Sequence, residues 1–427
     1  MIDRQYPYSA PYRGAAESDA GRRTNWLIGA CYVLLVVQFP LNHLYVLHVG
    51  IGSIPAVGGV IAGSTLVAFL VLLRHCLPII PIGDGIVAGV LIWLGVVAFL
   101  VAGQYLLNTS LIKDDLLEIV GVHGLTLYRC LFFFVAGIAI CQERQFSRVY
   151  RRVLFVLAAT LVFSVFVNSD FVLMQLDLSA APEELQGMYQ LLGDTAAVWF
   201  LFCCASIRSR SWFYGWVAVF SLTLGLIGSR TSLYAFVVAC VCFDLVGGLG
   251  HSSRWLIGVW SRIAIAVFIV GAMLLSMVEL FAGDNERILR AIIDRGSDSS
   301  LQFRDMQLDF ALGQIWGNWF FGVYGGQYSM FGRYGDYIHS YLEIWRQFGL
   351  IVFVAFVLLF LGFVALATRV REFPVSDVRN AALLTFIFSS VCILTSRSWG
   401  TPYVFLSFGI LAGLASGSRD LIRLSRL

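Results

Sequence analysis

The segment that begins at His339 has the residues best suited to acid–base chemistry. It reads HSYLEIWRQFG over 339–349, so Glu343 and Arg346 share a helical face with the histidine. A histidine can accept a proton from a hydroxyl near neutral pH, and a nearby carboxylate can orient its ring. We predict that His339 and Glu343 are catalytic, with a purely structural histidine as the alternative. A structural role is our prediction for three further histidines, which are His43, His48 and His123.

Two short turns carry arginines that could bind phosphate. Arg230 lies in Gly-Ser-Arg-Thr-Ser and Arg397 lies in Ser-Arg-Ser-Trp-Gly, each between two apolar runs. A planar guanidinium binds phosphate through paired hydrogen bonds, so two or three such residues could hold the diphosphate of a lipid-linked sugar. The alternative for a single arginine is that its charge reaches to the lipid headgroups. For the set we favour ligand binding. The predicted substrate site also includes Arg304, Arg333, Arg346 and Tyr341.

Arg304 belongs to a segment with the spacing of an amphipathic helix. If the segment is helical, Arg304 shares one face with leucine and isoleucine residues at 301, 308, 312 and 315. An arginine in such a stripe points toward protein or membrane rather than bulk water. Pairing with a buried aspartate is the equally open alternative to ligand binding.

The glycine-rich patch FGVYGG at 321–326 resembles a nucleotide-binding loop only superficially. It follows no strand of a βαβ unit, so we predict a sharp turn instead. The acidic residues around it do not have the spacing of metal ligands. We therefore predict no metal and no cofactor.

The composition indicates the elements that must position these residues. Hydrophobic residues make up 59% of the 427 positions and charged residues only 13%, with a mean hydropathy of +0.82. Soluble domains contain roughly 25% charged residues, so this chain is suited to lipid rather than water. The nine cysteines lie in or beside apolar runs and show no disulfide or CxxC metal pattern.

Runs of about 20 apolar residues predict an all-α membrane protein with about twelve spanning helices. The expected spans are 26–47, 49–73, 85–107, 125–141, 153–169, 192–207, 212–228, 231–247, 256–281, 346–368, 380–396 and 400–416. With the N-terminus inside, 18 of the 29 basic residues fall on the inner side, as the positive-inside rule requires. Two others, Arg129 and Arg262, lie within spans. The nine on the outer side are Lys113, Arg230, Arg287, Arg290, Arg295, Arg304, Arg333, Arg346 and Arg397.

A long polar stretch separates the ninth and tenth expected spans. We predict a disordered cytoplasmic tail at 1–25 and a first group of spans at 26–281. A partly helical outer loop with the active site follows at 282–345, then a second group of spans at 346–416 and a cytoplasmic tail at 417–427. A connection as long as the loop is typical of a functional segment.

In order and spacing, these features resemble the O-antigen ligase and O-antigen polymerase family. The shared features are the Ser-Arg turn at 229–230, the amphipathic segment from Arg304, the Gly-rich turn and the His-x-x-x-Glu run from His339, all within 220–370. The resemblance implies that His339 activates an acceptor hydroxyl and that Arg230 and Arg304 bind a diphosphate. Ser340 stands where many members have asparagine, and the loop is not net basic.

The resemblance implies a metal-independent glycosyltransferase of the bacterial inner membrane. We expect it to polymerise undecaprenyl-diphosphate-linked repeat units into O-antigen, capsule or exopolysaccharide at the periplasmic face. Its expected partners are the lipid-linked donor and acceptor, membrane lipids, and accessory proteins such as a chain-length regulator and a flippase. No nucleic acid is expected. An O-antigen ligase or a protein O-oligosaccharyltransferase is the alternative, disfavoured by the short segment after the last expected span. A polysaccharide or lipid transporter ranks behind both, because the sequence shows no repeated halves.

Overall fold

The computed structural model describes about half of the chain as well-placed elements. The described residues are 85–107, 113–142, 148–167, 169–170, 175–176, 189–245, 299–326, 341–373, 375–395, 397 and 399–424. The expected spans at 26–47, 49–73 and 256–281 lie outside these ranges, as does the expected N-terminal tail.

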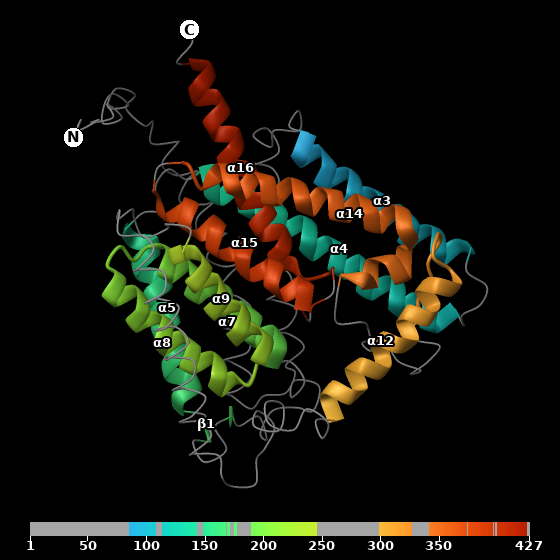
Figure 1. Cartoon of the computed structure of the whole chain (residues 1–427), viewed down its shortest axis with the longest axis horizontal. Helices are drawn as coiled ribbons and strands as arrows, with labels where there is room; N and C mark the ends of the chain where they lie inside the picture. Colours follow the sequence, from blue (N-terminus) through green and yellow to red (C-terminus); the bar gives the residue numbers. More distant parts are fainter. Residues whose placement is uncertain are drawn as a thin grey trace, which may run out of the picture.

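The described part is almost entirely helical (Figure 1). Its helices are α3 (Gly85–Leu107), α4 (Lys113–Gln142), α5 (Arg148–Val167), α7 (Tyr189–Ala205), α8 (Arg210–Ile227), α9 (Arg230–Leu245), α12 (Ser299–Gly317), α14 (Leu342–Val370), α15 (Asp377–Thr395) and α16 (Pro402–Leu424). Two strands of two residues each, β1 (Ser169–Asp170) and β2 (Gln175–Leu176), pair antiparallel. Each expected span within the described ranges coincides largely with one of these helices.

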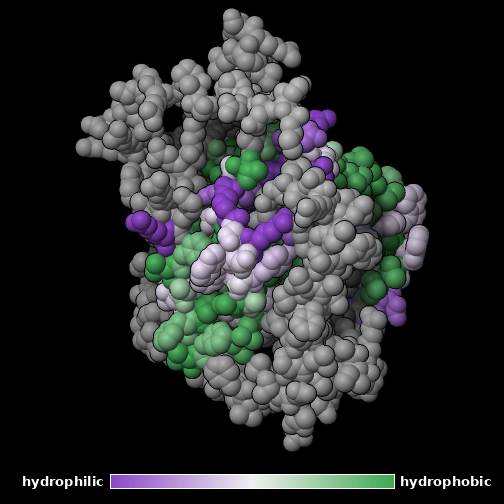
Figure 2. Space-filling view, turned by 60° about the vertical axis from the view of Figure 1, so that its left-hand side comes forward, coloured by the Kyte–Doolittle hydropathy of each residue, from purple (hydrophilic) through white to green (hydrophobic). Residues whose placement is uncertain are grey.

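Four of the described helices are long and apolar enough to cross a membrane. The apolar segments are Gly85–Leu106 in α3, Ile119–Cys141 in α4, Leu342–Val370 in α14 and Asp377–Thr395 in α15. Shorter apolar helical segments occur at Leu154–Val167, Leu192–Ala205 and Pro402–Ser416. Large apolar side chains such as Phe99, Leu106 and Leu358 are exposed on the outside of the bundle. On the face drawn in Figure 2, hydrophobic surface lies beside a compact hydrophilic patch. These features indicate a membrane protein.

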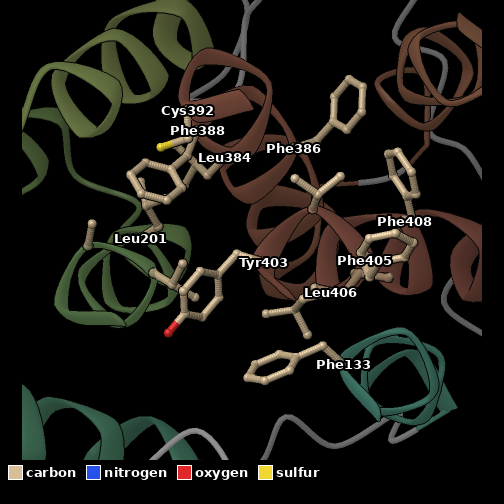
Figure 3. Packing of buried hydrophobic residues seen from close by; sticks show 14 of the residues in the cluster. Phe133, Leu201, Leu384, Phe386, Phe388, Cys392, Tyr403, Phe405, Leu406 and Phe408 are labelled. Atoms are coloured by element: carbon tan, nitrogen blue, oxygen red, sulfur yellow. The ribbon is translucent and has the colours of Figure 1, made fainter. Parts of the chain in front are cut away.

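The core is built around α16, which packs closely against α4. A Cβ atom at Gly409 would lie 2.1 Å from the carbonyl oxygen of Phe134, and one at Gly137 would lie 2.4 Å from that of Leu406. Only glycine permits this approach, as is common between membrane helices. Aromatic side chains fill the adjoining space, including Tyr403 and its neighbours in Figure 3. The close α4–α16 contact thereby fixes the turn that precedes α16, which belongs to the candidate site.

Candidate functional site

A buried carboxylate, Asp194 on α7, binds the arginine of one of the two turns singled out in the sequence. Its oxygens accept hydrogen bonds from Arg397 Nε at 2.7 Å and Arg397 Nη2 at 3.0 Å. Arg397 Nη1 also donates to Gln190 Oε1 at 3.2 Å. Both charged side chains are buried. This paired geometry holds the guanidinium in one orientation.

The same carboxylate also holds the second turn. Ser232, in the first turn of α9, donates its hydroxyl to Asp194 Oδ1 at 2.5 Å, and its oxygen lies 2.5 Å from that of Ser229. A Cβ atom at Gly193 would lie 2.3 Å from Ser229 Cβ, so glycine is needed for this approach. We call Gln190, Asp194, Ser229, Ser232 and Arg397 the Asp194 cluster. The sequence suggested two similar arginine turns, and the structure shows that they are neighbours.

A second set of buried polar residues, the Glu343 cluster, joins α14 to α12. It consists of Gln314, Glu343, Arg346 and Gln347. Arg346 Nε donates to Glu343 Oε2 at 3.1 Å, while Arg346 Nη2 and Gln347 Nε2 both donate to Glu343 Oε1. Arg346 Nη1 reaches Gln314 Oε1 on α12 at 3.3 Å. The ion pair therefore fixes the start of α14 against the end of α12.

The glycine-rich patch forms a turn that lies against the start of α14. Gly322 and Gly325 have positive φ angles of 76° and 68°, as a tight turn requires. The backbone N–H of Val323 donates to the carbonyl of Arg346 at 2.5 Å. Gly349, with φ of 80°, interrupts the regular geometry of α14 where this segment packs. The patch thus fixes the backbone of Arg346.

His123 on α4 lies between the two clusters, within a group of aromatic rings. Its Nδ1 lies 2.7 Å from the hydroxyl of Tyr324 in the glycine-rich turn. Its ring centroid lies 5.9 Å from that of Phe348 and 6.0 Å from that of Trp399, two residues after Arg397. Burial raises the pKa of Tyr324 well above its usual range, so the phenol stays neutral. His123 thereby links α4 to the glycine-rich turn and to the segment before α16.

The structure places some of the predicted site residues in buried ion pairs, places others without such a pairing, and does not describe the rest. Arg346 and Arg397 are buried and paired with carboxylates, whereas Arg230, which begins α9, is half-buried. Tyr341 directly precedes α14 and stacks on Phe353, with ring centroids 6.0 Å apart. The backbone of Arg304 lies in α12, in agreement with the predicted helix. His339 and Arg333 lie outside the described residues.

Glu343 has partners that the sequence did not indicate. It was expected to orient His339, but in the structure its oxygens accept hydrogen bonds from Arg346 and Gln347. Asp194 is not among the residues predicted for the site, because 192–207 has the composition of an apolar span. The available signal was a lone carboxylate inside an apolar run, which is costly unless it is paired. Within the described residues, no group of three or more potential metal ligands occurs.

Removing the charge of Glu343 is expected to destabilise the protein. In Glu343→Gln, Arg346 would remain buried without its counter-charge, which typically costs about 3–5 kcal/mol. Thermal unfolding of the purified protein in detergent should show a lower midpoint than for Asp309→Asn, a matched loss of charge at an exposed position on α12. Adding Arg346→Met should restore part of the loss. Equal midpoints for Glu343→Gln and Asp309→Asn would contradict this account of the cluster.

No protein-family model matches this sequence, and a search of curated proteins also finds no match.

Proposed function

We propose that this protein polymerises undecaprenyl-diphosphate-linked oligosaccharide repeat units at the periplasmic face of the bacterial inner membrane. The observation that carries the proposal is the meeting of two arginine turns, distant in sequence, at Asp194. Trp399 and His123 both pack against Phe348, which directly follows Gln347 of the Glu343 cluster. Arg230 begins α9 in one of these turns and is half-buried at one end of an apolar helical bundle, a place that suits a substrate with a diphosphate and a lipid tail.

The proposed reaction transfers the growing glycan from one lipid carrier to another. The bond between the anomeric carbon and the diphosphate oxygen breaks, and the anomeric carbon bonds to a hydroxyl oxygen of the acceptor repeat unit. His339 takes the hydroxyl proton. Arg230 and Arg304 stabilise the negative charge of the departing diphosphate. The pairing of Arg346 and Arg397 with carboxylates suggests that they shape the site by holding its elements together.

The proposed topology has twelve spans and two cytoplasmic termini. The charges of the described helix ends support this orientation, since the end of the bundle opposite to the Asp194 cluster carries exposed basic residues. There Arg208 pairs with Asp377 at 2.6 Å, across the α7–α8 and α14–α15 connections, and Arg369 and Arg371 lie nearby in sequence. The positive-inside rule favours this end for the cytoplasm. The loop containing α12 is then periplasmic.

Deleting the gene should change the length of the surface glycan. A polymerase is needed only to join repeat units, so mutant cells should still display single units attached to their normal acceptor. Electrophoresis and mass spectrometry of the extracted glycans would show this pattern, and a plasmid copy of the gene should restore long chains. Long chains that remain on the lipid carrier would instead indicate a ligase. Single units retained on the cytoplasmic side would indicate a transporter.

A further inference from the structure

Four aromatic residues at and just after the end of α12 are exposed together. They are Trp316, Trp319, Phe320 and Phe321, with exposed fractions of 70%, 51%, 40% and 82%. We call them the aromatic ridge. Phe320 contacts both neighbours edge-on, with centroids 5.5 Å from Trp319 and 4.9 Å from Phe321. A contiguous exposed patch of this kind marks an interaction surface.

The ridge is attached to the first turns of α14. Trp345 donates its indole N–H to the carbonyl of Trp319 at 2.7 Å, and its ring packs against Trp316 at 6.1 Å. The N–H of Leu350 donates to the carbonyl of Phe320 at 3.1 Å. A Cβ atom at Gly349 would lie only 2.1 Å from that carbonyl oxygen, so this contact depends on glycine. These contacts fix the position of the ridge relative to α14.

The apolar surface of α14 continues from the ridge. This helix is one of the four that can cross a membrane. Its large side chains remain exposed over about three turns, namely Ile351, Val354, Leu358 and Leu361. Since these face lipid in a spanning helix, the ridge lies where the helix leaves the hydrocarbon. Tryptophan is enriched at this level because its ring is apolar and its N–H is polar.

We propose that the aromatic ridge inserts into the interfacial layer of the bilayer and anchors α12 and the glycine-rich turn to the membrane surface. Phe321, the most exposed, reaches the acyl chains, and the tryptophans lie among the headgroups. The occupant of this surface is bilayer phospholipid. Because Val323 bonds to Arg346, the anchor also holds the Glu343 cluster near the headgroups. The anchoring does not depend on the proposed catalytic activity.

Photocrosslinking to lipid tests the anchor. The full chain with Phe321→p-benzoyl-phenylalanine would be reconstituted in vesicles of phosphatidylethanolamine and phosphatidylglycerol, irradiated and analysed by mass spectrometry. The same substitution at Phe99, exposed on the spanning helix α3, is the positive control, and Asp309 on α12 is the control for a water-facing position. All three positions are exposed, so each variant should fold.

Position 321 is expected to give phospholipid adducts at a yield close to that of position 99 and several-fold above that of position 309. A yield at 321 no higher than at 309, while 99 reacts, would overturn the anchor. Adducts with a second copy of the chain in place of lipid would also overturn it and identify an oligomer interface. Since the vesicles contain no lipid-linked sugar, the result is independent of polymerase activity. Failure of the anchor and failure of the proposed function can therefore be distinguished.

Discussion

Replacing His339 with alanine is expected to reduce polymer synthesis per membrane-inserted molecule by about 10²–10⁴-fold, the usual contribution of a general base. The alanine variant retains the arginines, so it should still bind the donor diphosphate. It lacks the group that takes the acceptor proton. The measurement is the rate of chain extension with purified lipid-linked repeat units, divided by the amount of inserted protein.

His75→Ala is the matched control, because His75 lies in an expected cytoplasmic loop and should not affect the rate. A structural role for His339 leads to a different result. The amount of inserted protein would then fall while the rate per molecule stayed normal. Near-normal specific activity in His339→Ala would remove the catalytic assignment.

Changing Arg230 or Arg304 to lysine is expected to lower the rate of chain extension by about 10²-fold. This is near the lower end of the effect seen when an enzyme loses one fixed hydrogen-bond donor to a negative charge that forms in the transition state. Lysine keeps the positive charge but loses the planar pair of donors that matches a phosphate group. Chain extension would be measured as for His339, with protein levels matched. Arg369→Lys, at the opposite end of α14, is the control and should be fully active. Full activity of both Arg230→Lys and Arg304→Lys would show that paired hydrogen bonds are not required.

Helices could be predicted from the sequence wherever an apolar run had clear limits. The run 85–107 coincides with α3, and the break between α8 and α9 falls at Gly228, whose φ of 80° ends the helix. The expected span at 125–141 covers only the later part of α4, which begins at Lys113. Its first turns contain charged residues, and hydropathy detects the apolar part of a helix rather than its hydrogen bonding.

The expected span begins at 346, although the run from 339 is itself expected to be helical, and α14 begins at Leu342. Glu343 and Arg346 look polar in sequence, but their charges balance each other inside the protein. The pairing of Asp194 with Arg397 joins residues 203 positions apart, and no local pattern could predict it. The aromatic ridge was visible in sequence as a cluster of rings, but its exposure depends on how α12 packs against α14.

The most direct test of the central claim is reconstitution of the purified protein in vesicles with undecaprenyl-diphosphate-linked repeat units, in the presence of a metal chelator. The account predicts a ladder of products that grow by one repeat unit at a time, with one undecaprenyl diphosphate released for each bond formed. The products would be separated by electrophoresis and the released lipid measured by mass spectrometry. Repeat units that cross the bilayer without being joined would contradict the claim. So would repeat units that stay unjoined in vesicles to which lipid A core is added and are transferred only to that core.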